Sequence, residues 1–267
     1  MRLLALDLDG TLLDPSGTVT PRTVEALRAA HAVGVNVVLA SGRPPFLAAA
    51  VIEALGGVVT HGVMANGSMI CTFPDGAPLR SIHFPIESAV GAVRLLRAAD
   101  ADFRFALATA NGFASEEGFA ERMASPGGLP VSGDALEVAI GATEARRLMV
   151  WHRSITTYDL LDQLPLLLGP ELSVGHVGAD AAEILPHGVD KGSGLRWLCE
   201  HLAVDRTDVV AIGDEYNDHD MLRWAGHGIA MGNADPVTKA LADAVTLTNA
   251  EDGVAVAVEQ LLAQRFP

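Results

Sequence analysis

Short apolar runs recur along the chain, each followed by a polar turn and then by a helical pattern. Residues 3–6 are entirely apolar, and residues 36–40 and 208–212 have a similar character. Runs of this kind are typical of strands buried on both faces of a parallel sheet. Helical patterns over residues 21–33 and 192–202 separate such strands. The alternation predicts an α/β domain with a parallel sheet, built from both ends of the chain.

The rhythm changes between the two ends. Residues 68–83 alternate around Pro74-Asp75-Gly76 like a β-hairpin. Beyond it we expect helices at 88–99 and 157–168 and strands at 103–108, 147–152, 172–177 and 182–185. This order predicts a separate α+β unit inserted into the first domain. The expected organisation is a core of residues 1–83 and 186–267 and an inserted domain of residues 84–185.

Composition narrows the classes of function. A formal net charge of −15 disfavours nucleic acid or an anionic membrane as a partner, but it does not exclude a phosphorylated small molecule. There is no run of 18 apolar residues, and the first strand follows directly on Met1-Arg2, so we expect neither a membrane span nor a signal peptide. Cys71 and Cys199 fit no metal or redox spacing, which favours a reducing cytoplasm. The oligomeric state is left open.

The first apolar run ends in two carboxylates, Asp7 and Asp9, followed by Gly10 and Thr11. In open α/β sheets, ligands bind beyond the carboxyl ends of the strands. Alternation along an extended chain would put Asp7 and Asp9 on one face. Because two carboxylates repel each other and are costly to bury alone, we expect a cation there, and Mg²⁺ suits an all-oxygen site. An ordinary turn with a helix cap is the alternative.

Further polar groups follow later elements, and we expect them at the same edge of the sheet. Ser41 stands at a predicted, proline-rich helix start, where free N–H groups would bind an anion; a simple Ser cap is the alternative. Lys191 lies in the first turn of its helix and opposes the helix dipole, which is unfavourable unless an anion lies nearby. The alternative is a lysine that simply faces solvent. Asp214 and Asp218 have helix capping as their alternative. Their joint occurrence favours one common site.

Taken together, these residues resemble the haloacid dehalogenase superfamily, all four of whose motifs are matched in order. Asp7-Leu8-Asp9-Gly10-Thr11 is similar to the first motif and Ser41-Gly42-Arg43-Pro44 to the second. Lys191-Gly192 is similar to the third motif and Gly213-Asp214-Glu215-Tyr216-Asn217-Asp218 to the fourth. The insert and Met231-Gly232-Asn233-Ala234 resemble the Cof-like sugar-phosphate phosphatase branch, which has a large α/β cap. The resemblance implies a Rossmann-like core with a cap that selects the substrate.

The same resemblance implies a Mg²⁺-dependent phosphatase that hydrolyses a small phosphorylated metabolite through an aspartyl-phosphate. Asp7 would be the nucleophile, and Asp9 the general acid and base. The metal would be bound by Asp7, the Asp9 carbonyl oxygen, Asp214 and Asp218. The phosphoryl group would be held by Thr11, Ser41, Gly42, Lys191 and Asn217. Arg43 and Asn66 are assigned to the rest of the substrate, with a plain turn as the alternative for Asn66.

Two rival functions stay open. A phosphomutase of the same superfamily would share every core residue but return the phosphate to its substrate. A phospho-accepting receiver module also combines an acid pair, a Ser or Thr and a Lys on a parallel sheet. Such a module is less than half as long, and its accepting Asp lies on a later strand. The sequence does not identify the substrate.

Overall fold

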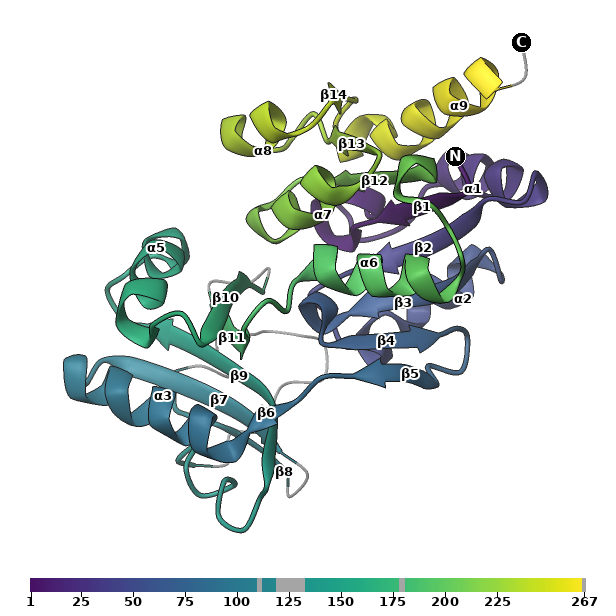
Figure 1. Cartoon of the computed structure of the whole chain (residues 1–267). Helices are drawn as coiled ribbons and strands as arrows, with labels where there is room; N and C mark the ends of the chain where they lie inside the picture. The colour runs from purple at the N-terminus through teal and green to yellow at the C-terminus, as the bar shows by residue number, and fades with distance from the viewer. Residues whose placement is uncertain (110–111, 119–132, 178–180, 266–267) are drawn as a thin grey trace. The chain divides into compact units, whose positions relative to one another are not determined.

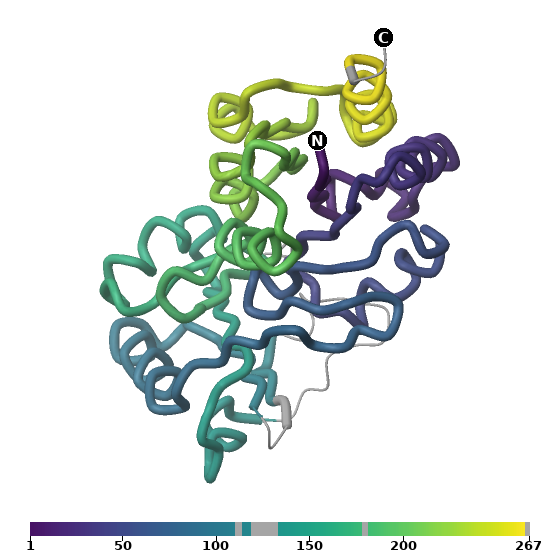
Figure 2. The backbone as a smooth tube through the Cα atoms, turned by 45° about the vertical axis from the view of Figure 1, so that its right-hand side comes forward, coloured from purple at the N-terminus to yellow at the C-terminus, as the bar shows by residue number. Residues whose placement is uncertain are grey.

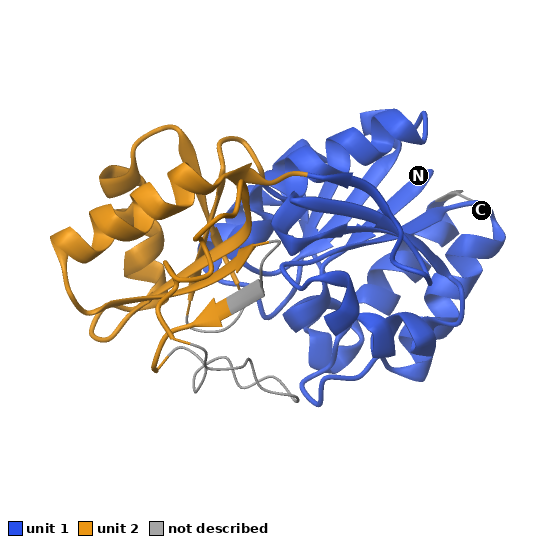
Figure 3. Ribbon diagram, turned by 90° about the horizontal axis from the view of Figure 1, so that it is seen from below, with its two compact units in different colours: residues 1–81, 190–267 blue, residues 82–189 orange. Residues whose placement is uncertain are grey.

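The chain forms two compact units in the computed structural model (Figure 3). Unit 1 comprises Met1–Ser81 and Asp190–Pro267, and unit 2 comprises Ile82–Val189. The structure describes residues 1–109, 112–118, 133–177 and 181–265. Within these ranges, no helix is both long enough and apolar enough to cross a lipid bilayer.

Unit 1 is built on an eight-stranded sheet. Its strands, in spatial order, are β14 (Ala244–Val245), β13 (His227–Ala230), β12 (Val209–Gly213), β1 (Leu3–Leu6), β2 (Asn36–Ala40), β3 (Val59–Met64), β4 (Met69–Thr72) and β5 (Pro78–Ser81). Neighbours from β14 to β3 pair in parallel, whereas β4 and β5 are antiparallel. The predicted parallel sheet is therefore confirmed, with the predicted hairpin at one edge.

Helices cover both faces of this sheet, which explains why β1 is apolar throughout. Leu4 and Leu6 pack on the side of α1 (Pro21–Ala32), α2 (Ala49–Leu55) and α9 (Gly253–Arg265). Leu3 and Ala5 pack on the side of α6 (Lys191–His201) and α7 (His219–Trp224), and α8 (Pro236–Leu241) follows β13. The first and last helices, α1 and α9, lie side by side (Figures 1 and 2).

The centre of the sheet is a topological switch point. Strand β1 pairs with β2 on one side and with β12 on the other. From β1 the chain continues to β2 and β3 on one side of the sheet, and from β12 it continues to β13 and β14 on the other side. Ligands of open α/β sheets bind at such points, beyond the carboxyl ends of the strands. Asp7, Ser41 and Asp214 are the residues that directly follow β1, β2 and β12.

Unit 2 has an antiparallel sheet with its own core. Its strands, in spatial order, are β10 (Leu172–His176), β11 (Ala182–Pro186), β9 (Glu144–His152), β7 (Phe103–Thr109) and β8 (Gly112–Ser115), and β6 (Phe84–Pro85) also pairs with β9. Helices α3 (Ile86–Ala99) and α5 (Thr157–Leu168) pack on one face around Phe105 and Leu148. The predicted helix at 157–168 is confirmed, whereas β8 was not predicted because it lies in a glycine-rich stretch.

The prediction of a helix that begins near Ser41 is wrong. A short 3₁₀ turn, η2 (Pro45–Leu47), comes first, and α2 begins only at Ala49. A proline disfavours the helical conformation in the residue before it, and Pro44, which precedes Pro45, is extended with φ −68° and ψ 156°. No helix therefore begins beside Ser41, so helix N–H groups do not supply the anion site that we expected there.

Candidate active site

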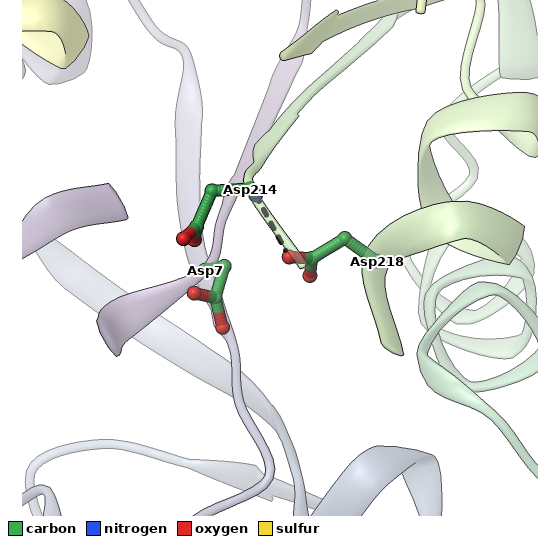
Figure 4. A group of neighbouring side chains, drawn as sticks. All are labelled: Asp7, Asp214 and Asp218. Carbon is green, nitrogen blue, oxygen red and sulfur yellow. Dashed lines mark hydrogen bonds between the residues drawn. The ribbon is translucent and has the colours of Figure 1, made fainter. Parts of the chain in front are cut away.

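Three buried carboxylates converge at the switch point. Asp7 follows β1, Asp214 follows β12, and Asp218 ends the 3₁₀ turn η5 (Tyr216–Asp218). One oxygen from each lies within 4.8 Å of the others. Figure 4 shows the Asp214 carboxylate pointing toward Asp7, with Asp218 beside them. The prediction that strand ends bring Asp7 and Asp214 together thus agrees with their positions.

Lys191 reaches the same cluster from the first turn of α6. Asp190 caps this helix, accepting a hydrogen bond from the Ser193 N–H at 2.7 Å. The Lys191 ammonium donates to Asp7 Oδ1 at 2.6 Å and to Asp218 Oδ1 at 2.7 Å, and its side chain is fully buried. The anion that we expected near this lysine is therefore a pair of carboxylates.

The electrostatics of the cluster are unbalanced. The pKa of Asp7 is raised to about 7, first by burial and then by repulsion from Asp218, while Lys191 opposes both effects. Burial and the charges of Asp7 and Asp218 raise the pKa of Asp214 to about 8. Burial alone would lower the pKa of Lys191, but the two carboxylates it contacts hold that pKa above its ordinary value. When all four groups are ionised, three negative charges and one positive charge leave a net charge of −2.

The turn after β1 is shaped to hold Asp214. Gly10 has φ +81°, and a Cβ atom there would lie 2.2 Å from Asp214 Oδ2, so only glycine fits. The hydroxyl of Thr11 donates to Asp214 Oδ1 at 2.7 Å and is buried. Thr11 was predicted to bind phosphate, but in the structure its hydroxyl orients a carboxylate.

Asp218 organises the loop that carries the other acid. Its Oδ2 accepts hydrogen bonds from the backbone N–H groups of Asp214 at 3.0 Å and Glu215 at 3.1 Å. This close approach requires Gly213, because a Cβ there would lie 2.5 Å from Asp218 Cγ. Asp218 is thus the third residue of a capping box in η5, but its side chain makes no capping hydrogen bond to the following helix, α7, so the capping alternative does not hold there.

A second group of predicted residues lies at the ends of β2 and β3 and in η5. Asn217 Nδ2 donates to Asn66 Oδ1 at 3.0 Å, and a Cβ on Gly42 would lie 3.1 Å from the same oxygen. Asn66 is buried in a left-handed turn with φ +51°, so it is both a turn residue and a contact of Asn217. Ser41 is buried, and its Oγ accepts from the Arg43 N–H at 3.1 Å, which leaves the hydroxyl proton to donate.

The position of the Asp9 side chain differs from the prediction. Strand β1 ends at Leu6, and the chain then turns through η1 (Leu8–Leu12), so strand alternation stops before Asp9. Asp7 is buried, whereas the Asp9 side chain is 49% exposed. Both oxygens of Asp9 are bound by Arg43, with Nε at 2.8 Å from Oδ2. The placement of Asp7 and Asp9 on one face is therefore wrong, and Arg43, assigned to the substrate, pairs with Asp9.

Asn233 is the contact that sequence reasoning missed. Its Nδ2 donates to the Gly10 carbonyl oxygen at 2.8 Å and to Asp214 Oδ2 at 3.3 Å. It lies in the loop after β13, the strand next to β12. A polar residue after one more parallel strand of the same sheet was the available signal.

Comparison with known proteins finds one matching family model and several similar proteins. A family model of haloacid dehalogenase-like hydrolases matches residues 4–258. Phosphatase YwpJ of Bacillus subtilis is 30% identical, over 98% of this chain and 100% of that protein. Pyridoxal phosphate phosphatase YbhA of Escherichia coli is 29% identical, over 95% of this chain and 96% of that protein. The structure of the phosphatase BT1666 from Bacteroides thetaiotaomicron is similar with a TM-score of 0.81 at 27% identity, covering 97% of this chain and 94% of that one.

Proposed function

The chain belongs to the haloacid dehalogenase-like hydrolases and is a phosphoric monoester hydrolase, and we propose that it hydrolyses a small phosphorylated metabolite with Mg²⁺ through an aspartyl-phosphate at Asp7. The observation that carries this proposal is the buried cluster of Asp7, Asp214 and Asp218 with Lys191. The relative that acts on pyridoxal phosphate supports a substrate of this size and class.

The donor set fits a divalent cation. It offers carboxylate oxygens, which Mg²⁺ prefers, and the net charge of −2 of the ionised cluster matches one such ion. Asp7 and Asp214 would be its ligands, with the Asp9 carbonyl oxygen, while Asp218 supports them. When bound, Mg²⁺ would neutralise the repulsion between the carboxylates and an incoming phosphate.

The residues of this chain then have distinct tasks in phosphoryl transfer. An oxygen of Asp7 forms a bond to phosphorus while the bond between phosphorus and the leaving oxygen breaks, and Asp9 supplies the proton to that oxygen. In the second half, Asp9 takes a proton from water, which attacks phosphorus and releases the Asp7 carboxylate and inorganic phosphate. Lys191, already in contact with Asp7, would stabilise the charge on the phosphoryl oxygens.

Polar groups around this centre would hold the substrate. The Ser41 hydroxyl and the Asn217 amide, with the backbone at Gly42, would bind the phosphoryl oxygens. Asn66 fixes the Asn217 side chain through its Oδ1. Before Asp9 can serve the leaving group, its carboxylate has to exchange its contact with Arg43 for one with the substrate.

We assign substrate selection to unit 2, which corresponds to the insert predicted at residues 84–185. All residues to which we assign a chemical role lie outside it, so it would act on leaving-group binding and water exclusion. Cys71 and Cys199 are both free and buried, which supports a reducing compartment such as the cytoplasm.

The test is a screen of sugar phosphates, nucleotides and phosphorylated cofactors for release of inorganic phosphate, with and without Mg²⁺. We expect release that requires Mg²⁺ and is lost in Asp7→Asn. Transfer of phosphate back to the substrate without net release would identify a mutase instead. Release that is independent of divalent cations, or that persists in Asp7→Asn, would contradict the proposal.

A further inference from the structure

Asn233 joins two parts of the active site that come from opposite ends of the chain. Its amide nitrogen donates both to the Gly10 carbonyl oxygen, at 2.8 Å, and to Asp214 Oδ2, at 3.3 Å. Gly10 belongs to the turn after β1, and Asp214 follows β12. Since Thr11 already donates to Asp214 Oδ1, the two hydrogen bonds together set the angle of the Asp214 carboxylate.

The orientation of the Asn233 amide is itself fixed. The backbone N–H of Asn249 donates to Asn233 Oδ1 at 2.9 Å, so the oxygen must face Asn249 and the nitrogen must face Gly10 and Asp214. The backbone on either side is also held, because the Gly232 N–H donates to the Leu247 carbonyl oxygen at 2.9 Å and the Ala234 N–H to the Met231 carbonyl oxygen at 3.1 Å.

Asn249 completes a bridge to the same turn. Its side-chain Nδ2 donates to the Leu13 carbonyl oxygen at 2.8 Å, just beyond the turn that begins at Leu8. The turn is thus held by Asn233 at Gly10 and by Asn249 at Leu13. We call Asn233 and Asn249 the amide bridge.

We propose that Asn233 is a positioning residue for the divalent cation site, and that the amide bridge sets the affinity of that site by fixing the Asp214 carboxylate and the turn after Asp7. This inference rests on the proposed function. Partners that orient metal ligands through hydrogen bonds are worth about 10- to 100-fold in metal affinity. Asn233 is also a neutral donor, so it orients Asp214 without competing as a charge for the cation.

The experiment measures Mg²⁺ binding to the substrate-free protein by isothermal titration calorimetry. Asn233→Ala should raise the Kd for Mg²⁺ by about tenfold. With saturating Mg²⁺, the KM for p-nitrophenyl phosphate should remain at the wild-type value, because we assign Asn233 to the metal site and not to substrate binding. Asn36→Ala is the matched control, since it removes an amide-to-carbonyl hydrogen bond at the start of β2 and should leave the Kd unchanged.

A purely structural role would lower the melting temperature of Asn233→Ala and leave its Mg²⁺ affinity unchanged. A Kd within twofold of wild type would therefore overturn the inference, as would a raised KM with an unchanged Kd. If Asn233→Ala does not fold, Asn249→Ala tests the bridge from its other end by removing only the bond to Leu13. It should raise the Kd by a smaller factor, and an unchanged Kd there would overturn the inference.

Binding of Mg²⁺ is measured without substrate, so the two proposals fail in different ways. If the wild type binds Mg²⁺ but releases phosphate from no compound, the proposed function fails and the Kd values still decide the inference. If the wild type binds no Mg²⁺, both are overturned.

Discussion

Lys191→Met removes the ammonium from the carboxylate cluster and keeps the length of the side chain. The Lys191 side chain is fully buried and contacts Asp7 and Asp218, so its loss leaves three buried carboxylates without their partner. Removing one partner of a buried ion pair costs about 3–5 kcal/mol. For a chain of this size that corresponds to a fall in Tm of roughly 6–20 °C for the metal-free protein.

The same change should separate metal binding from turnover. Without the lysine the site is more negative, so we expect Mg²⁺ to bind more tightly and to raise the Tm of the variant more than that of the wild type. Phosphate release should nevertheless be lost, because Lys191 would hold the phosphoryl oxygens. The assays are thermal unfolding in a chelator and in saturating Mg²⁺, together with phosphate release at saturating Mg²⁺.

Lys239→Met is the matched control, because Lys239 is the only other lysine in the sequence and lies half-buried in α8. It should change neither Tm nor activity appreciably. If Lys191→Met unfolds at the same temperature as Lys239→Met in chelator, the buried ion pairs do not stabilise unit 1. If it retains phosphate release within tenfold of wild type, the reasoning about the lysine is refuted.

Three further predictions follow from the same contacts. Because the pKa values of Asp7 and Asp214 are raised from 3.8 to about 7 and about 8, the folded state keeps protons that the unfolded state has released. In chelator, Tm should therefore fall as the pH rises from about 4 to about 8, and Mg²⁺ should abolish the fall, whereas a flat profile in chelator would contradict it. Gly10→Ala should lower both Tm and Mg²⁺ affinity, because φ is +81° and the new Cβ would lie 2.2 Å from Asp214 Oδ2; calorimetry that finds both unchanged would rule out this close contact. Arg43→Ala breaks a half-exposed ion pair with Asp9, so the free energy of unfolding should fall by no more than about 1 kcal/mol; a clearly larger loss in a denaturant titration would contradict this.

The sequence predicted the parts of the fold and the site that depend on local pattern. The apolar run at 3–6 predicts a doubly buried strand, and the residue that follows it lies at the carboxyl edge of the sheet whatever the rest of the chain does. Asp7 and Asp214 lie together because they follow neighbouring parallel strands, β1 and β12. Lys191 and Asp218 could be assigned to the same site because Lys191 stands at the start of a predicted helix and Asp218 lies in the loop after a predicted strand.

The contacts that could not be predicted depend on turn geometry and on distant partners. The pairing of Arg43 with Asp9 arises because the chain leaves the extended conformation at Leu8, which strand alternation does not foresee. The bond from Asn233 to Gly10 joins residues 223 positions apart; a place after a parallel strand puts Asn233 at the same edge of the sheet but does not specify its partner.

The central claim is that Asp7 carries the phosphoryl group during turnover. It is tested most directly by rapid acid quench of the wild type with ³²P-labelled substrate and Mg²⁺, followed by peptide mapping of the labelled residue. We expect an alkali-labile acyl phosphate on the peptide that contains Asp7, and no label in Asp7→Asn. Steady phosphate release with no labelled enzyme at any quench time, or a label on another residue, would contradict it.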